Sequence, residues 1–259
     1  MLVLHGGPGA SHDYLLPQMI GLDTAAAGGR DLLFYDQRGG GRSRHDDDRA
    51  AIGWQEQVAD VGRVITEFGL EGAPLAGYSW GGLLALLYVL EARRANGPLP
   101  SQLILIDPAP LSRQYRDSFE AEFAARQASP RLQELRQELA DSGLRERDPE
   151  AYRQRLFELS VAGYFADPAR ARDLTPFRVT GRVQQSIWAS LGDYDLVPDL
   201  AQVQLPAVVV HGRQDPIPLA SSEAGARALG AELFVLEDCG HVPYVEQPAA
   251  LFTALAPFL

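Results

Sequence analysis

The sequence feature that most constrains the fold is Gly77-Tyr78-Ser79-Trp80-Gly81, a serine held between two glycines. A short apolar run at residues 73–76 precedes it, and a leucine-rich run at residues 83–90 follows it. A strand that turns at once into a helix crowds the positions two before and two after the turn residue, so glycine fits best there. The pattern therefore predicts a nucleophile elbow, in which Ser79 projects from the carboxyl edge of a sheet.

Apolar runs and helical periodicities alternate on both sides of this turn. They predict strands at residues 1–4, 31–36, 73–76, 102–107, 207–212 and 232–236, and helices at residues 11–27, 54–68, 83–90, 220–229 and 248–258. Strands that alternate with helices are typical of an α/β fold, with a mostly parallel sheet flanked by helices. Residues 44–49 are expected to form a short charged loop.

The segment from residue 111 to residue 200 has a different character. Arginine and glutamate dominate it, apolar residues recur at helical spacing, and no strong strand pattern appears. We therefore expect a helical cap at residues 111–200, inserted into a core built from residues 1–110 and 201–259.

Charge and composition restrict the classes of partner. The net charge of −11 and the pI near 4.9 argue against binding to nucleic acid or to an anionic membrane surface. One cysteine, Cys239, rules out an internal disulfide, and the five histidines show no metal-binding spacing, so neither a metal nor a cofactor is expected. The chain opens with no charged leader and has no apolar stretch of membrane-spanning length, so we expect a cytoplasmic protein.

A nucleophilic Ser79 needs a base and an acid, which in this architecture follow in the order serine, acid, histidine. His241 is the histidine that lies in a loop after the last expected strand, so it is the predicted base. Asp215, just beyond the strand at 207–212, is the predicted acid. Asp107, at the end of the preceding strand, is the rival, because a neighbouring parallel strand can supply the acid without changing the geometry.

An oxyanion hole needs two backbone N–H donors. One is expected from Trp80, directly after the serine. The other is expected from Gly7, in the glycine-rich loop His5-Gly6-Gly7-Pro8-Gly9 that follows the first strand. A phosphate-binding loop is disfavoured there, because no lysine or threonine follows and the G-x-G-x-x-G spacing is absent.

These motifs together resemble the proline iminopeptidase branch of the α/β-hydrolase superfamily. The resemblance rests on His5–Gly9, on Tyr35-Asp36-Gln37-Arg38-Gly39 with Gly41-Arg42-Ser43, on Ser79–Gly82, on His211–Asp215 and on Gly240-His241. It implies an eight-stranded, mostly parallel sheet under a helical cap, with Ser79, Asp215 and His241 as the triad and Gly7 and Trp80 as the oxyanion hole. It also implies release of an N-terminal residue, typically proline, from short peptides whose free amine is held by carboxylates of the cap.

The chain departs from that branch in the cap. Residues 174–192 contain no Asp or Glu and carry Arg178 and Arg182, which would favour an acidic acyl group or a free carboxylate. Carboxylates elsewhere in the cap could bind an amine instead; they are Glu120, Glu122, Glu158, Asp193 and Asp195. The substrate-binding candidates are therefore Arg178, Arg182 and Glu158, with no motif that selects among them.

A second departure concerns the first strands. Members of this fold normally have two strands before the one that ends in His-Gly-Gly, and only four residues precede His5 here. The strand at residues 32–35 would then be an open edge, which invites pairing with another chain. We expect a homodimer contact or poor solubility.

Other functions stay open on the sequence alone. A carboxylesterase, a lactonase or a C–C bond hydrolase could use the same triad on a small-molecule substrate, and a hydrolase-like binding protein without catalysis is a further alternative. An elbow aspartate would indicate dehalogenase or epoxide hydrolase chemistry, and position 79 is serine.

Overall fold

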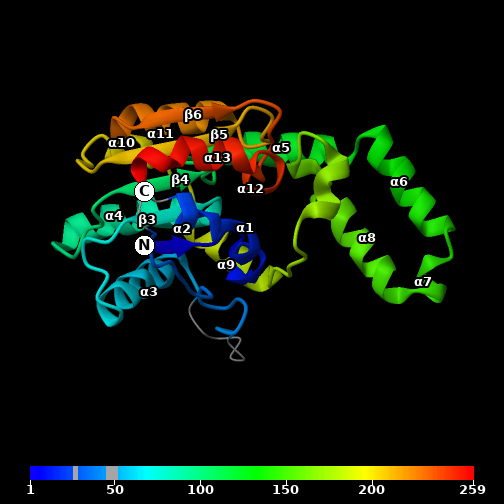
Figure 1. The fold of residues 1–259 in the computed structure, drawn as a ribbon, viewed down its shortest axis with the longest axis horizontal. Coiled ribbons are helices and arrows are strands. Elements are labelled where there is room, and N and C mark those ends of the chain that lie inside the picture. Colours follow the sequence, from blue (N-terminus) through cyan, green and yellow to red (C-terminus); the bar gives the residue numbers. More distant parts are fainter. Residues whose placement is uncertain (26–28, 45–51) are drawn as a thin grey trace.

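A computed structural model describes residues 1–25, 29–44 and 52–259, and its centre is a parallel sheet of six strands (Figure 1). The strands are β1 (Leu2–Leu4), β2 (Leu33–Phe34), β3 (Leu75–Tyr78), β4 (Leu103–Ile106), β5 (Ala207–Gly212) and β6 (Glu232–Leu236). Their order across the sheet is β2-β1-β3-β4-β5-β6, and every neighbouring pair is parallel. All carboxyl ends therefore meet at one edge, where the loops carrying the site lie.

Side-chain alternation along the strands creates a core on each face of the sheet. In β4, Leu103 and Leu105 belong to one core, whereas Ile104 and Ile106 belong to the other. Both faces are covered, so the central strands are mostly apolar, and β3, β4 and β5 are buried along their whole length.

Helices pack on both faces. One core contains residues of α3 (Trp54–Glu67), α4 (Trp80–Ala95) and α11 (Leu219–Leu229). The other contains residues of α1 (Leu16–Met19), α2 (Gly21–Ala25), α12 (Pro243–Glu246) and α13 (Pro248–Leu255). Twelve of the sixteen residues of α4 are buried, because it crosses the middle of the sheet behind the elbow.

The chain between β4 and β5 is helical. It contains α5 (Arg113–Gln127), α6 (Pro130–Asp141), α7 (Leu144–Arg147), α8 (Pro149–Val161), α9 (Gly181–Leu191) and α10 (Val197–Leu200), with short 3₁₀ turns at Ala162–Tyr164 and Pro168–Asp173. Figure 1 shows α6, α7 and α8 extending away from the sheet as an arm, whereas α9 and α10 lie beside the core. Division of the chain into a core and a cap at residues 111–200 stays a prediction.

The region before β2 differs from the expected single helix at residues 11–27. It forms a 3₁₀ turn at His12–Tyr14, followed by the short helices α1 and α2, and residues 26–28 lie outside the described residues. Pro17 accounts for the start of α1, because proline favours the first turn of a helix, and glycine at position 21 allows close packing, since an added Cβ would lie 2.7 Å from the ring of Phe252.

Two further expectations concern the β2 side of the sheet. The strand expected at residues 31–36 is confined to Leu33–Phe34, which forms an edge and pairs with β1. The charged loop expected at 44–49 lies outside the described residues from position 45 onward. Within the described part of the chain, no helix combines the length and the apolar character that crossing a membrane requires.

Candidate active site

Ser79 stands at the sharp turn between β3 and α4, as the sequence predicts. Its backbone angles, φ 53° and ψ −119°, are unusual for a residue with a side chain. An added Cβ at Gly77 would lie 2.3 Å from the Gly81 oxygen, and one at Gly81 would lie 2.1 Å from the Leu4 oxygen. The glycines thus allow the backbone to fold tightly enough to present the serine hydroxyl at the sheet edge.

The structure brings the three predicted triad residues together. His241 Nε2 lies 2.9 Å from Ser79 Oγ, and His241 Nδ1 lies 2.7 Å from Asp215 Oδ2. Asp215 follows β5 and also accepts a 2.7 Å hydrogen bond from the Ile217 N–H, which orients its carboxylate. Two further hydrogen bonds fix the loop that carries His241. The His241 N–H donates to the Tyr164 oxygen, and the Tyr78 hydroxyl donates to the His241 backbone oxygen.

The rival acid, Asp107, is close but makes different bonds. Its Oδ1 accepts a 2.8 Å hydrogen bond from the Gly212 N–H, and among the described residues its fully buried Oδ2 has no partner. Polar atoms of Asp107, Asp215 and His241 lie within 4.8 Å of one another, a set whose spacing could hold a metal ion. In that set Asp215 and His241 are already hydrogen-bonded to each other.

Burial dominates the electrostatics of this cluster. It lowers the pKa of His241 to about 4, against the opposing charges of Asp107 and Glu246. It raises the pKa of Asp215 to about 8, opposed first by the Ile217 N–H, and it raises the pKa of Asp107 well above the usual range, reinforced by the charge of Asp215. Of the two aspartates, Asp215 is therefore the first to become a carboxylate, which suits it to orient the imidazole.

The two predicted oxyanion donors lie beside the serine. Trp80 is the first residue of α4, so its backbone N–H is at the positive end of that helix. Gly7 lines the same cavities as Ser79 and has φ +66°, a conformation that favours glycine. Gly6 brings the two segments together, because an added Cβ there would lie 2.9 Å from the Ser79 Cβ.

Two cavities open beside Ser79. The outer cavity, about 600 Å³, is lined by core loops and by α5 and α9, including Arg113, Arg116, Phe119, Glu120, Phe123 and Trp188. The inner cavity, about 300 Å³, is lined by aromatic and aliphatic side chains, including Tyr14, Tyr78, Phe157, Leu174, Phe177 and Tyr244. Gly7, Ser79, Tyr164, Gln184 and His241 line both, so a substrate that reaches Ser79 has a separate space on each side.

The charges near Ser79 come from α5. Arg116 stacks over the Trp188 ring at 4.4 Å and pairs with Glu120 at 2.7 Å. Arg113, which lies about one turn before Arg116 in α5, pairs with Asp117. The sequence prediction included Glu120 only as one of several carboxylates, and it did not include Arg113 or Arg116. One available signal was Ser112, which caps the start of α5 by accepting a hydrogen bond from the Tyr115 N–H.

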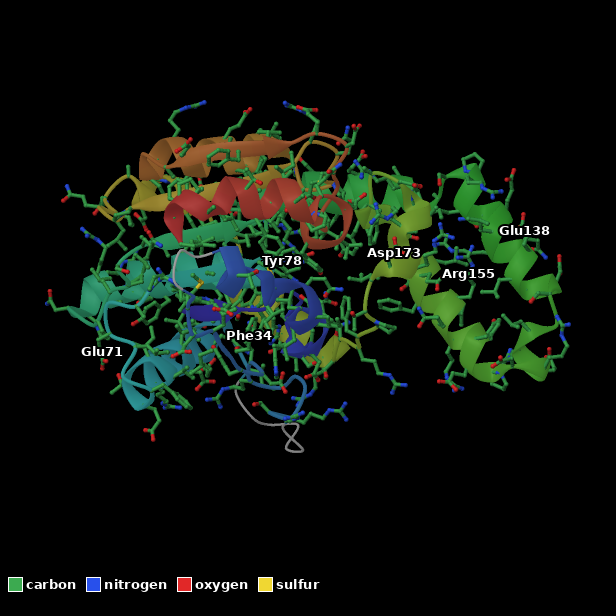
Figure 2. The ribbon with its side chains drawn as sticks, viewed as in Figure 1. Phe34, Glu71, Tyr78, Glu138, Arg155 and Asp173 are labelled. Atoms are coloured by element: carbon green, nitrogen blue, oxygen red, sulfur yellow. The ribbon has the colours of Figure 1, made fainter. Side chains whose placement is uncertain are left out.

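The other substrate-binding candidates lie elsewhere. Arg178 and Arg182 line a separate cavity of about 530 Å³, which Ser79 does not line. Glu158 on α8 pairs with Arg155 at 2.6 Å and is absent from the described lining of both Ser79 cavities. In Figure 2, Arg155 and Glu138 lie on the arm, whereas Tyr78, which precedes Ser79, lies at the sheet.

Comparisons with known proteins agree with this geometry. The profile of the alpha/beta hydrolase family matches residues 1–254. The proline iminopeptidase of Lactobacillus delbrueckii subsp. lactis is 28% identical over 282 residues, covering 100% of this chain and 89% of the relative.

Solved structures show the same fold. The proline iminopeptidase of Mycobacterium smegmatis superposes with a TM-score of 0.68 at 22% identity, over 99% of this chain and 87% of that one. An esterase from Exiguobacterium antarcticum superposes with a TM-score of 0.66 at 24% identity, over 99% and 90%. Proteins with different activities thus share this architecture.

Proposed function

Because the chain belongs to the alpha/beta hydrolase family, we propose that it is a serine hydrolase that works through an acyl-enzyme. The observation that carries this proposal is the continuous pair of hydrogen bonds from Ser79 through His241 to Asp215, at 2.9 and 2.7 Å. A serine hydroxyl is a weak nucleophile unless a base takes its proton, and here a base is within reach and is itself oriented by a carboxylate.

In the proposed reaction, Ser79 Oγ attacks the substrate carbonyl while His241 takes its proton. The backbone N–H groups of Gly7 and Trp80 hold the oxyanion, and Asp215 stabilises the imidazolium. His241 then protonates the leaving group, and water repeats the cycle on the acyl-enzyme. The two cavities on either side of Ser79 would hold the acyl part and the leaving group.

Within this class, we propose an aminopeptidase that resembles proline iminopeptidase and releases an N-terminal residue from short peptides. Relatives of that name match the whole chain at 26% and 28% identity. Such a reaction needs a carboxylate near the substrate's free amine. Among the described lining residues of the two Ser79 cavities, Glu120 is the carboxylate available for that role.

A carboxylesterase is the second candidate, and it is favoured by the ion pair that Glu120 already makes with Arg116. Glu120 already pairs with Arg116, which also stacks on Trp188, so an incoming amine has to compete with a guanidinium. The described lining of the inner cavity contains no Asp, Glu, Lys or Arg, and burial favours the neutral form of its one histidine, His241, which suits an uncharged acyl group.

Labelling with a fluorophosphonate tests the serine-hydrolase proposal. We expect one covalent adduct on Ser79 and none in Ser79→Ala, which should also lose on the order of 10⁶ in kcat. An unlabelled wild-type protein would reject acyl-enzyme chemistry and favour a binding protein.

A panel of substrates tests the choice between peptidase and esterase. Prolyl and alanyl arylamides are compared with their N-acetylated forms and with short acyl nitrophenyl esters. An aminopeptidase should prefer the free amine, and Glu120→Gln should remove that preference. Glu122→Gln is the matched control, since Glu122 lies on the same helix and pairs with Arg126 outside the cavity lining. Equal rates on free and acetylated amides, unchanged by Glu120→Gln, would favour the esterase.

A further inference from the structure

Gln37 is a polar residue buried completely behind the active site. It follows β2 and the short segment Tyr35-Asp36, and neither cavity beside Ser79 has it among its described lining residues. The mechanism proposed above gives it no part. A buried amide needs partners for both its oxygen and its nitrogen, so the groups that satisfy it show what it holds together.

Each end of the Gln37 side chain bonds to a different catalytic segment. The amide Nε2 donates a 2.8 Å hydrogen bond to the His5 oxygen, in the loop that contains Gly7. The amide Oε1 accepts a 2.8 Å hydrogen bond from the indole Nε1 of Trp80. One side chain therefore links Trp80, which carries one proposed oxyanion donor, to His5, which lies two positions before the other donor, Gly7.

The Gln37 backbone adds a third bond that fixes His5. Its N–H donates to His5 Nε2 at 3.2 Å, while His5 Nδ1 lies 2.9 Å from the Gly6 oxygen. These two bonds require the neutral tautomer with the proton on Nδ1. Burial lowers the pKa of His5 to about 4, so the ring stays neutral and the loop stays attached to Gln37 at neutral pH.

We propose that Gln37 is a positioning residue for the oxyanion hole, acting by holding the Gly7 loop at a fixed distance from the Trp80 end of α4. The inference rests on the proposed serine-hydrolase function. Both donors are backbone groups, so their separation depends on the side chains that join their segments. A donor displaced by a fraction of an ångström stabilises the tetrahedral oxyanion less, while ground-state binding in the cavities is unaffected.

The first test replaces Gln37 by methionine, which has a similar volume and neither hydrogen-bonding group. In Gln37→Met we expect kcat to fall by about 10- to 100-fold with KM within about twofold, because the loss appears mainly in the transition state. Inhibition by an alkyl boronic acid, whose tetrahedral adduct places an oxygen in the oxyanion hole, should weaken by a similar factor.

The second variant removes the other side of one bond. Trp80→Phe keeps the backbone N–H and an aromatic ring beside Trp188; it removes the indole N–H that donates to Gln37, together with part of the buried ring volume. Trp80→Phe should lower kcat and, like Gln37→Met, should leave KM within about twofold of the wild-type value. Because both substitutions break the same contact, the double variant should lose less than the product of the single losses. If Gln37→Met does not fold, Trp80→Phe alone tests whether the Gln37–Trp80 contact positions the oxyanion hole.

Gln57 provides the matched control. It is a second completely buried glutamine, on α3; its Nε2 donates to the Arg38 oxygen at 2.9 Å, and its Oε1 has no hydrogen-bond partner among the described residues. Gln57→Met removes one side-chain hydrogen bond where Gln37→Met removes two, so it should lower the melting temperature by less, and it should leave kcat and boronate affinity within about twofold.

Three results separate the possible failures. If wild-type turnover is abolished by Ser79→Ala while Gln37→Met and Trp80→Phe keep wild-type kcat and boronate affinity, the positioning role is rejected and the hydrolase function stands. If Gln57→Met loses kcat as strongly as Gln37→Met, the effect is general destabilisation and the positioning role is again rejected. If the wild type shows no turnover that depends on Ser79, both proposals are rejected.

Discussion

Ser79 Oγ and His241 Nε2 lie 2.9 Å apart although 162 positions separate them in the chain. Parallel pairing makes this possible, because the turn after β3 and the loop after β6 leave the sheet at the same edge. The hydroxyl is thus within reach of its base before any substrate binds. Two short bonds, to Tyr164 and from Tyr78, hold the His241 backbone in place.

The acid side of the pH profile should lie above the range of a free imidazole. The triad works when His241 is neutral and Asp215 is a carboxylate, and burial opposes that charge: it raises the pKa of Asp215 to about 8 and lowers that of His241 to about 4. The first proton that this pair takes up removes the working form, so we expect kcat/KM to fall about tenfold per pH unit with a midpoint above about 6.5, the usual pKa of histidine. Circular dichroism at each pH separates this loss from unfolding, since the buried His5 and His211 have pKa values near 4. A kcat/KM that stays flat down to about pH 5 would contradict the prediction.

Asp215 and Asp107 should differ sharply in their effect on rate. Asp215→Asn should lower kcat by roughly 10⁴-fold, because the amide favours the wrong tautomer of the imidazole. Asp107→Asn should stay within about tenfold of wild type, because burial keeps this carboxyl neutral and the amide oxygen still accepts the Gly212 N–H. Steady-state rates of both variants, measured on one ester, show which aspartate acts as the acid of the triad. A larger loss in Asp107→Asn would transfer the role of acid to that residue.

Gly81 should tolerate no side chain. In Gly81→Ala the new methyl group would lie 2.1 Å from the Leu4 oxygen, so β1 and α4 have to separate. We expect a loss of at least about 3 kcal/mol in the free energy of unfolding, measured by urea denaturation. Gly181→Ala is the control: nothing lies within 4 Å of its added Cβ at the start of α9, and it should be neutral or about 0.5 kcal/mol more stable.

The edge formed by β2 still predicts self-association. Leu33 and Phe34 pair with β1 on one side only and are partly exposed. We expect sedimentation velocity to show a dimer at micromolar concentration, and Phe34→Lys to shift it toward monomer, because a charge disfavours strand pairing. Ile20→Lys, at an exposed position outside the sheet, is the control. A wild-type protein that sediments as a monomer would reject the prediction.

Much of the fold could be predicted from sequence because its signals are local. The elbow glycines and the apolar runs predict from sequence alone that Ser79 lies between a strand and a helix, which are β3 and α4. The order of strands likewise placed Asp215 and His241 at the same edge. Even the choice of Asp215 over Asp107 followed from position, and the observed bond to His241 agrees with it.

The substrate side of the site could not be predicted because it depends on packing between distant helices. Arg178 and Arg182 stand out in the sequence because residues 174–192 contain no Asp or Glu, yet they line a cavity that Ser79 does not share. Arg116 lines the Ser79 cavity because side chains of α5 and α9 meet there, and its guanidinium lies over the Trp188 ring. Nothing in the local sequence encodes that contact. Gln37 belongs to the motif Tyr35-Asp36-Gln37-Arg38-Gly39, but its bonds to His5 and Trp80 appear only in three dimensions.

The arm formed by α6, α7 and α8 projects from the body of the molecule (Figure 1). Of its three helices, α8 contributes Phe157, Ser160 and Val161 to the inner cavity, whereas no described residue of α6 or α7 lines either space beside Ser79. The outer half of the arm is therefore a natural attachment point. A fluorescent dye or a solid support could be joined at α6 or α7 to follow or immobilise the protein while leaving its chemistry untouched.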